Sequence, residues 1–386
     1  MSQPNDVVMY HSTLPANNAD SYVENSQIEF VIDIPQGRAM KEGTLNIQFD
    51  LRVNRTGAPG ANGTRVVGAN EIGYDHLVGG HGIFQSFQSS ANSGMIESLQ
   101  NYPRSVKMYN ETQMSRNAVF SGLNQCELLM PNFANTNSIC CGYTIANAGG
   151  GANTRTRDFD CNVKPLIALN RTVTPISPMK TGRINLVAIL ERNNGFLHGN
   201  DVDNDCNYSI SNVELQYISI LDTSKPSDKL TFFTTSSQKN TLQSARSNIT
   251  CVVPDMITSV YASFIEQADE FSNIPNNTKT SVIKSIDNIK FLANDSQSQN
   301  IVYQQDTYDE ILKNYVETLQ ESKRNEVNNA ILATNNGFGI GQNFSGAGMN
   351  LLNNKLDLEI TTIGATGISN ANPYTLFTYF NGVLTM

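Results

Sequence analysis

The stretch Ile83–Ile96, IFQSFQSSANSGMI, contains two short apolar strands joined by the polar turn Ala91–Gly94. A polar stretch of helical character follows, from about Arg104 to Arg116. The second half of the chain repeats this order: residues 286–303, IDNIKFLANDSQSQNIVY, read as strand, turn and strand, and a polar helix follows over about Asp306–Arg324. The same order of elements in both halves predicts two β-rich modules in tandem.

Alternating strands surround both units. In Thr44–Val53 every second residue is apolar, which is the pattern of a half-buried strand in an antiparallel sheet. Ile28–Ile34 is a second strong strand signal, and each half closes on an alternating strand, Val213–Ile220 and Tyr374–Phe380. Many strands, long connections and turns rich in Asn and Gly favour sandwiches with Greek-key connections. We therefore predict an all-β fold of two tandem eight-stranded jelly-roll sandwiches, a double jelly roll, with short helices in the connecting loops.

The chain length agrees with two domains. Its 386 residues suit two units of roughly 150–200 residues each. The polar segment 222–228, which contains Pro226, is the predicted boundary. We expect an N-terminal arm over 1–25, a first jelly roll over 26–224 and a second over 225–386. The first carries a long loop insertion around 123–182, and Asn335–Gly348 is expected to be a Gly-rich loop. Within the insertion, Val163–Leu169 is predicted as a short strand.

The charge and the N-terminus exclude several functions. The formal net charge is −9 and no basic run is visible, so direct sequence-specific nucleic-acid binding is not expected. The first 25 residues lack the pattern of a secretory signal, and no apolar run reaches the roughly 18–20 residues that span a bilayer. The six cysteines form no CxxC pair, so we expect reduced thiols.

Two segments could suggest a cation site. His76 and His81 lie near Glu71 and Asp75, but the spacing of a cupin-type metal site is absent, so loop or interface roles are expected. Asp201–Asp205 resembles the start of a calcium loop; the sixth position is Cys206 and the twelfth is Asn212, where an EF-hand needs Gly and Glu. A solvated acidic loop is the preferred interpretation, with a weakly bound cation as the alternative.

No motif predicts an enzyme. Gly337–Gly341 lacks the third glycine of a dinucleotide-binding loop, because Phe344 stands in its place. There is no GxSxG, no Cys/His set and no pair of carboxylates that stands out. We therefore predict no catalytic residues, no cofactor-binding or metal-binding residues, and no cofactor.

Several segments resemble a known family of capsid proteins. They are Gly80–Phe87, Gly94–Ser98 and Tyr102–Arg104 in the first half, and Ile286–Asp295 and Ile301–Tyr303 in the second. The chain is similar to the double jelly-roll major capsid proteins of adenovirus-like viruses, tectiviruses, virophages and polinton-like viruses. The resemblance covers most of the chain as an architecture with loose motifs, and the length suits the smaller members.

The resemblance implies a structural major capsid protein that forms trimeric, pseudo-hexagonal capsomers in the shell of an icosahedral virus. The implied partners are two further copies of the chain, neighbouring capsomers and minor or penton capsid proteins, with contact to an internal membrane left open. The implied location is the virion, assembled in the host cytoplasm or nucleus and not secreted. The alternative is a carbohydrate-binding or receptor-binding β-sandwich of spike or lectin type, which shares the strand pattern but does not need the tandem repeat.

Overall fold

A computed structural model describes most of the chain. The described residues are 8–56, 74–75, 78–113, 126–129, 154–197, 206–270, 280, 283, 285–294, 300–319, 339–344, 348–351, 355–364 and 367–386. Glu71, His76, Asp201–Asp205 and Gly337, which the sequence analysis considered as possible site residues, lie outside these residues.

The first sandwich consists of two antiparallel sheets. The first sheet has the order β1 (Met9–Thr13), β10 (Cys206–Leu221), β5 (Asn46–Thr56) and β8 (Thr154–Val163). Two short strands, β2 (Ser21–Val23) and β4 (Arg38–Met40), also pair with β10. The second sheet has the order β3 (Gln27–Ile32), β9 (Ile184–Leu190), β6 (Phe84–Ala91) and β7 (Gly94–Gln100).

The second sandwich is built in the same way. One sheet has the order β11 (Thr231–Leu242), β19 (Tyr374–Thr385), β13 (Met256–Glu266) and β16 (Gly339–Asn343), with β17 (Met349–Asn350) beside β13. The other has the order β12 (Arg246–Cys251), β18 (Leu356–Thr362), β14 (Ile286–Asn294) and β15 (Asn300–Gln305). If the eight main strands of each half are counted along the chain, both sandwiches have the order 1-8-3-6 in one sheet and 2-7-4-5 in the other. The predicted double jelly roll is confirmed.

A helix follows the fifth main strand in each half. Helix α1 is Tyr102–Gln113 and helix α7 is Tyr308–Leu319, each within two residues of its predicted start. The other helices among the described residues are one-turn pieces in connections: η1 (Gly79–Ile83), η2 (Ala168–Asn170), α4 (Pro178–Thr181), α5 (Asn193–Phe196) and α6 (Gln267–Glu270).

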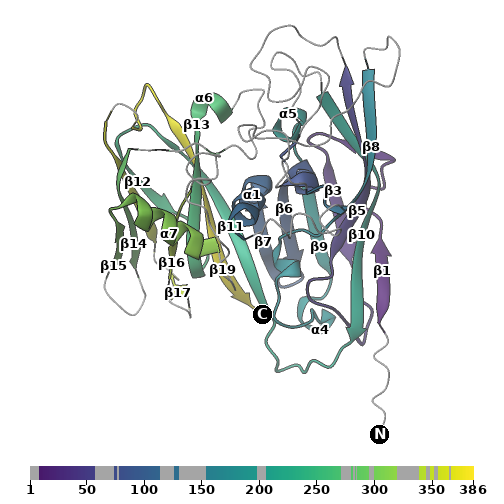
Figure 1. Ribbon diagram of the computed structural model, residues 1–386. Helices are drawn as coiled ribbons and strands as arrows, with labels where there is room; N and C mark the ends of the chain where they lie inside the picture. The colour runs from purple at the N-terminus through teal and green to yellow at the C-terminus, as the bar shows by residue number, and fades with distance from the viewer. Residues whose placement is uncertain are drawn as a thin grey trace.

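The two cores form one continuous hydrophobic cluster. Alternation places Ile47, Phe49 and Leu51 of β5 fully inside the first sandwich, as the sequence pattern predicts. Figure 1 shows the sandwiches side by side with α1 between them, and buried apolar residues run from one half into the other. This continuity makes the boundary between the halves a packed interface.

The prediction of an N-terminal arm over 1–25 is wrong for residues 9–13 and 21–23, which are strands of the first sheet. Strand β1 pairs with β10 from Met9↔Ser219 to Thr13↔Leu215, and β2 pairs with β10 farther along the same edge. The first sheet therefore begins at Met9. The segment was missed because β1 is short and largely exposed at the sheet edge, so it lacks the alternation of an inner strand.

Two predicted loops also contain strands of the sandwiches. Within the predicted insertion around 123–182, β8 pairs along the length of β5, whereas 164–169 is not a strand and Ala168–Asn170 forms η2. Within Asn335–Gly348, Gly339–Asn343 is β16 and pairs with β13. Its glycines are required by close packing: a Cβ on Gly339 would lie 2.4 Å from Tyr315 Cε2 of α7 and 2.7 Å from the Ala262 carbonyl oxygen.

Gly339→Ala is expected to lower the free energy of unfolding by about 1–3 kcal/mol, because the added methyl group overpacks a site bounded by backbone. Thermal unfolding followed by circular dichroism measures the loss. Asn248→Ala, at an exposed position of β12, is the control and is expected to change stability by less than about 0.5 kcal/mol. Equal melting temperatures for the two variants would contradict the packing explanation.

Candidate functional site: the junction between the sandwiches

Strand β7 of the first sandwich lies beside β11 of the second (Figure 1). Backbone and hydroxyl groups connect the two edges: the Gln100 N–H donates to Ser237 Oγ at 2.8 Å, and the Ser237 hydroxyl donates to the Gln100 carbonyl at 3.0 Å. We call the contact of β7, η2 and α1 with β11, β13 and β19 the junction.

The side-chain carboxyl group of Glu97 in β7 accepts hydrogen bonds from both sandwiches. Its Oε2 accepts the Ala168 N–H of η2 at 2.8 Å, and its Oε1 accepts the Thr235 N–H of β11 at 2.7 Å. The side chain is buried, with 4% of the residue surface exposed. Burial raises the pKa of Glu97 to about 7, against the hydrogen bonds from Ala168 and Thr235 and the charge of Arg171, which lower it. A carboxyl group that titrates near neutral pH therefore sits inside the junction.

Arg171 adds a second polar connection from the segment after η2. Its guanidinium donates to Thr235 Oγ1 at 2.8 Å, and its carbonyl accepts the Phe233 N–H at 2.8 Å. The Thr235 hydroxyl in turn donates to Asn381 Oδ1 of β19 at 2.9 Å. Polar groups on both sides of the junction are thus hydrogen-bonded, as buried polar groups require.

Helix α1 attaches to the broad face of the sheet formed by β13 and β19. Ser105 Oγ lies 2.6 Å from the Tyr261 hydroxyl, and the Tyr379 hydroxyl donates to the Asn101 carbonyl at 2.9 Å. The Tyr261 and Tyr379 rings are stacked with centroids 5.1 Å apart. These tyrosines present apolar rings to the helix and place their hydroxyls on polar partners.

Arg104 is the largest fully buried side chain, with 1% of its surface exposed. Its guanidinium carbon lies 4.3 Å from the centroid of the Phe377 ring, a cation–π geometry across the junction. Burial lowers the pKa of Arg104 to about 10, while Tyr379, Glu270 and Glu191 act in the opposite direction. The residue therefore stays cationic at neutral pH and brings a charge from the first sandwich into the second.

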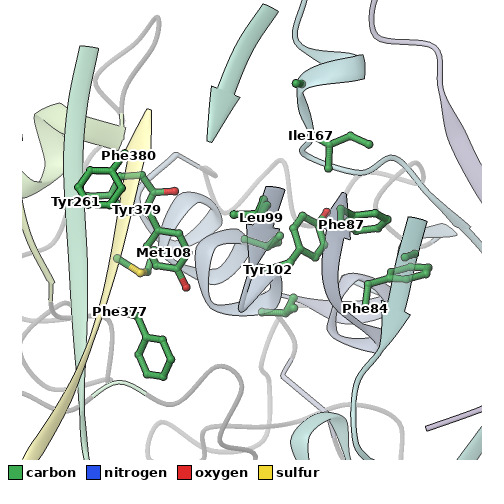
Figure 2. Close-up of a cluster of buried hydrophobic side chains, with 14 of the residues drawn as sticks. Phe84, Phe87, Leu99, Tyr102, Met108, Ile167, Tyr261, Phe377, Tyr379 and Phe380 are labelled. Carbon is green, nitrogen blue, oxygen red and sulfur yellow. The ribbon is translucent and has the colours of Figure 1, made fainter. Parts of the chain in front are cut away.

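Figure 2 shows how the apolar side chains continue through the junction. Phe84, Phe87, Leu99 and Tyr102 lie on one side of α1, and Tyr261, Phe377, Tyr379 and Phe380 lie on the other. Met108 of α1 points toward the second group. Since all of these residues are buried, the two sandwiches share one packed interior around the helix.

The structure places His81 in the interior of the first sandwich. His81 Nδ1 lies 2.6 Å from the Tyr102 hydroxyl, which accepts the Leu166 N–H at 3.0 Å. His81 Nε2 lies 3.5 Å from Glu127 Oε2. Burial raises the pKa of Glu127, but the hydrogen bonds from His81 and the Lys164 N–H, together with the charges of both residues, outweigh it and the net pKa is lowered. These contacts give His81 a structural role in holding η1 against α1.

Asp75, the other described member of the histidine-rich segment, forms a buried ion pair with Lys107 of α1 at 2.7 Å. No group of three His, Cys, Asp or Glu residues in the described ranges could hold a metal ion.

Helices long and apolar enough to cross a membrane are likewise absent from the part of the chain that the structure describes. Three of the described cysteines, Cys161, Cys206 and Cys251, are buried free thiols, and burial raises the pKa of Cys251 to about 12 and that of Cys161 further.

A cavity of about 200 Å³ lies beside the connection between the sandwiches, with Lys180, Asp222 and Asp228 in its lining. It is smaller than the roughly 300–1,000 Å³ of typical ligand pockets. The site that the sequence did not reveal is the junction itself. Glu97 and Arg104 have partners more than 70 residues away in sequence, and no local pattern connects them.

No protein-family model and no curated protein sequence matches the chain. Solved structures do match: the Faustovirus major capsid protein has 10% identity and a TM-score of 0.58, over 100% of this chain and 91% of that one. A chain of the Sputnik virophage structure has 12% identity and a TM-score of 0.62, over 100% and 87%. The mavirus major capsid protein has 10% identity and a TM-score of 0.53, over 97% and 88%.

The chain has the fold of double jelly-roll major capsid proteins. At these identities the likeness is one of fold, and it covers 97–100% of this chain and 87–91% of the three similar chains. The resemblance seen in the sequence is thereby confirmed at the level of architecture.

Proposed function

We propose that the chain is a structural major capsid protein that forms trimeric, pseudo-hexagonal capsomers of an icosahedral virus shell. The observation that carries the proposal is the pair of sandwiches with identical strand order, fixed side by side by a buried junction. Three such chains present six similar sandwiches, which gives a trimer the outline that hexagonal tiling needs.

The proposal extends to partners and location. The partners are two further copies of the chain, neighbouring capsomers and minor or penton capsid proteins, and the location is the virion after assembly in the host cell. We also propose that the division between the two jelly rolls lies between residues 224 and 225. The similar structures belong to capsid proteins, which are structural, and we extend this to propose that the chain has no enzymatic activity.

The alternative of a carbohydrate-binding or receptor-binding sandwich is less well supported. A lectin needs one sandwich with an exposed binding surface, whereas this chain matches two-sandwich capsid proteins from end to end. The junction also uses buried charges to fix the two halves, which a binding module does not require.

Light scattering coupled to size exclusion is expected to give a mass of about 127 kDa, because each of three chains contributes 42.3 kDa. The mass should persist on dilution, and electron microscopy should then show hexagonal outlines. A monomer at every concentration would contradict the proposal, and binding of the protein to a glycan array would favour the alternative.

A further inference from the structure

Two of the sheet edges, at β15 and β1, lie at opposite sides of the molecule. Among the described strands, β15 pairs only with β14, and β1 pairs only with β10. Figure 1 shows β15 at the far left of the molecule and β1 at the far right. Exposed edges present unpaired N–H and C=O groups and are the natural sites of association between chains.

Both edges carry exposed apolar side chains. Val302 of β15 is 52% exposed, and on β1 Met9 is 44% and Tyr10 is 82% exposed. Apolar residues on a sheet edge favour association, and monomeric proteins commonly protect such edges with charges or prolines. The two edges therefore have the composition of contact surfaces.

The junction within the chain shows how such edges fit together. Strand β7 is the fifth main strand of the first sandwich, and it lies beside β11, the first strand of the second. Their counterparts in the repeat are β15 and β1. The hairpin register aligns them: Phe87 lies opposite Leu99 and Phe291 opposite Tyr303, so Gln304 corresponds to Gln100, which binds the Ser237 hydroxyl.

The two long helices also indicate that the side of the second sandwich at β15 is a contact surface. Helix α1 follows β7 and is covered by β13 and β19 of the next sandwich, so even Arg104, which lies on the Phe377 ring, is buried. Helix α7 follows β15, yet Asp309, Glu310 and Lys313 are exposed. The side of the second sandwich at β15 therefore lacks the cover that the first sandwich receives from within the chain.

We propose that β15 of one copy docks beside β1 of the next copy, in the manner of β7 beside β11. The proposal rests on the proposed trimer and names the surfaces that form it. The contact is head-to-tail, since it joins different surfaces, and such contacts produce either closed rings or open filaments. Three copies close the ring, in which three contacts between chains alternate with three junctions within chains.

Val302→Asp and Tyr10→Asp test the contact. Each variant places a carboxylate in an apolar contact, and the concentration at which the trimer dissociates is expected to rise at least about tenfold. Val252→Asp is the control, because Val252 is 83% exposed and lies just beyond β12. Combining Val302→Asp with Tyr10→Lys is expected to restore part of the lost association. Circular dichroism should show unchanged folding, since both residues are exposed.

The outcomes separate the two proposals. A wild-type protein that is monomeric would overturn the proposed function. A wild-type trimer that both aspartate variants leave as stable as the control would overturn the docking of β15 beside β1 alone. A photoreactive benzoylphenylalanine at position 302 gives an independent test: crosslinks to a peptide containing residues 8–13 of another copy support the contact, and crosslinks only to other segments overturn it.

Discussion

Arg104→Ala is expected to lower the free energy of unfolding by about 3–5 kcal/mol, the range for removing one partner of a buried charge cluster. The guanidinium lies on the Phe377 ring and beside the buried carboxyl groups of Glu270 and Glu191. Truncation leaves those groups without its charge and opens a cavity at the junction. Urea denaturation followed by circular dichroism and tyrosine fluorescence measures the loss, because the chain has 14 Tyr and no Trp.

Two further variants show whether the loss of stability in Arg104→Ala comes from the buried charge and its stacking on Phe377. Arg104→Lys keeps the positive charge but lacks the planar group that stacks on Phe377, so its loss is expected to be intermediate. Arg52→Ala removes an exposed ion pair with Asp158 and is expected to leave the midpoint close to that of the wild type. All proteins are compared at one concentration, since association contributes to apparent stability. Equal losses for Arg104→Ala and Arg52→Ala would show that the junction charge is unimportant.

Glu97→Gln is expected to change how stability depends on pH. The pKa of Glu97 is about 7 in the folded protein against an ordinary value of 4.5, so folding favours the protonated form. Its stabilising contribution is fully present below about pH 4.5 and is lost as the pH rises through about 7. The stability of the wild type relative to Glu97→Gln should therefore fall by about 3 kcal/mol between pH 4.5 and 8.

The difference between the two proteins isolates this carboxyl group. Other acidic groups, such as Asp222 and Asp357, have lowered pKa values and give the opposite trend in both proteins, so their effect cancels. Glu42→Gln, at an exposed position, is the control and should leave the pH profile unchanged. A stability difference that stays constant from pH 4.5 to 8 would contradict a titrating Glu97.

The sequence predicted the inner strands and helices well, because their signals are local. Thr44–Val53 alternates, and β5 runs over Asn46–Thr56. The hairpins, the helices after them and the closing strands also follow from periods that a short window contains. The architecture of two sandwiches could be predicted because few folds contain the same unit of two strands and a helix twice in one chain.

The missed features depend on contacts between distant residues. Strand β1 is recognisable only through its pairing with β10, about 200 residues later. The glycines of β16 suggest a loop when the sequence is considered alone. They are needed because α7 packs closely against this strand. Glu97 is buried between η2 of the first sandwich and β11 of the second, and its two backbone donors, Ala168 and Thr235, are distant from it in sequence.

The packed helix between the sandwiches also decides how the molecule carries force. The connection 222–230 is mostly exposed, whereas α1 is enclosed by side chains of both halves. A force applied to one sandwich is therefore transmitted to the other through the close-packed atoms around α1 and not through the exposed connection 222–230. The two sandwiches are therefore expected to move as one rigid body. An assembly of such chains would flex at the contacts between chains and resist bending within each of them.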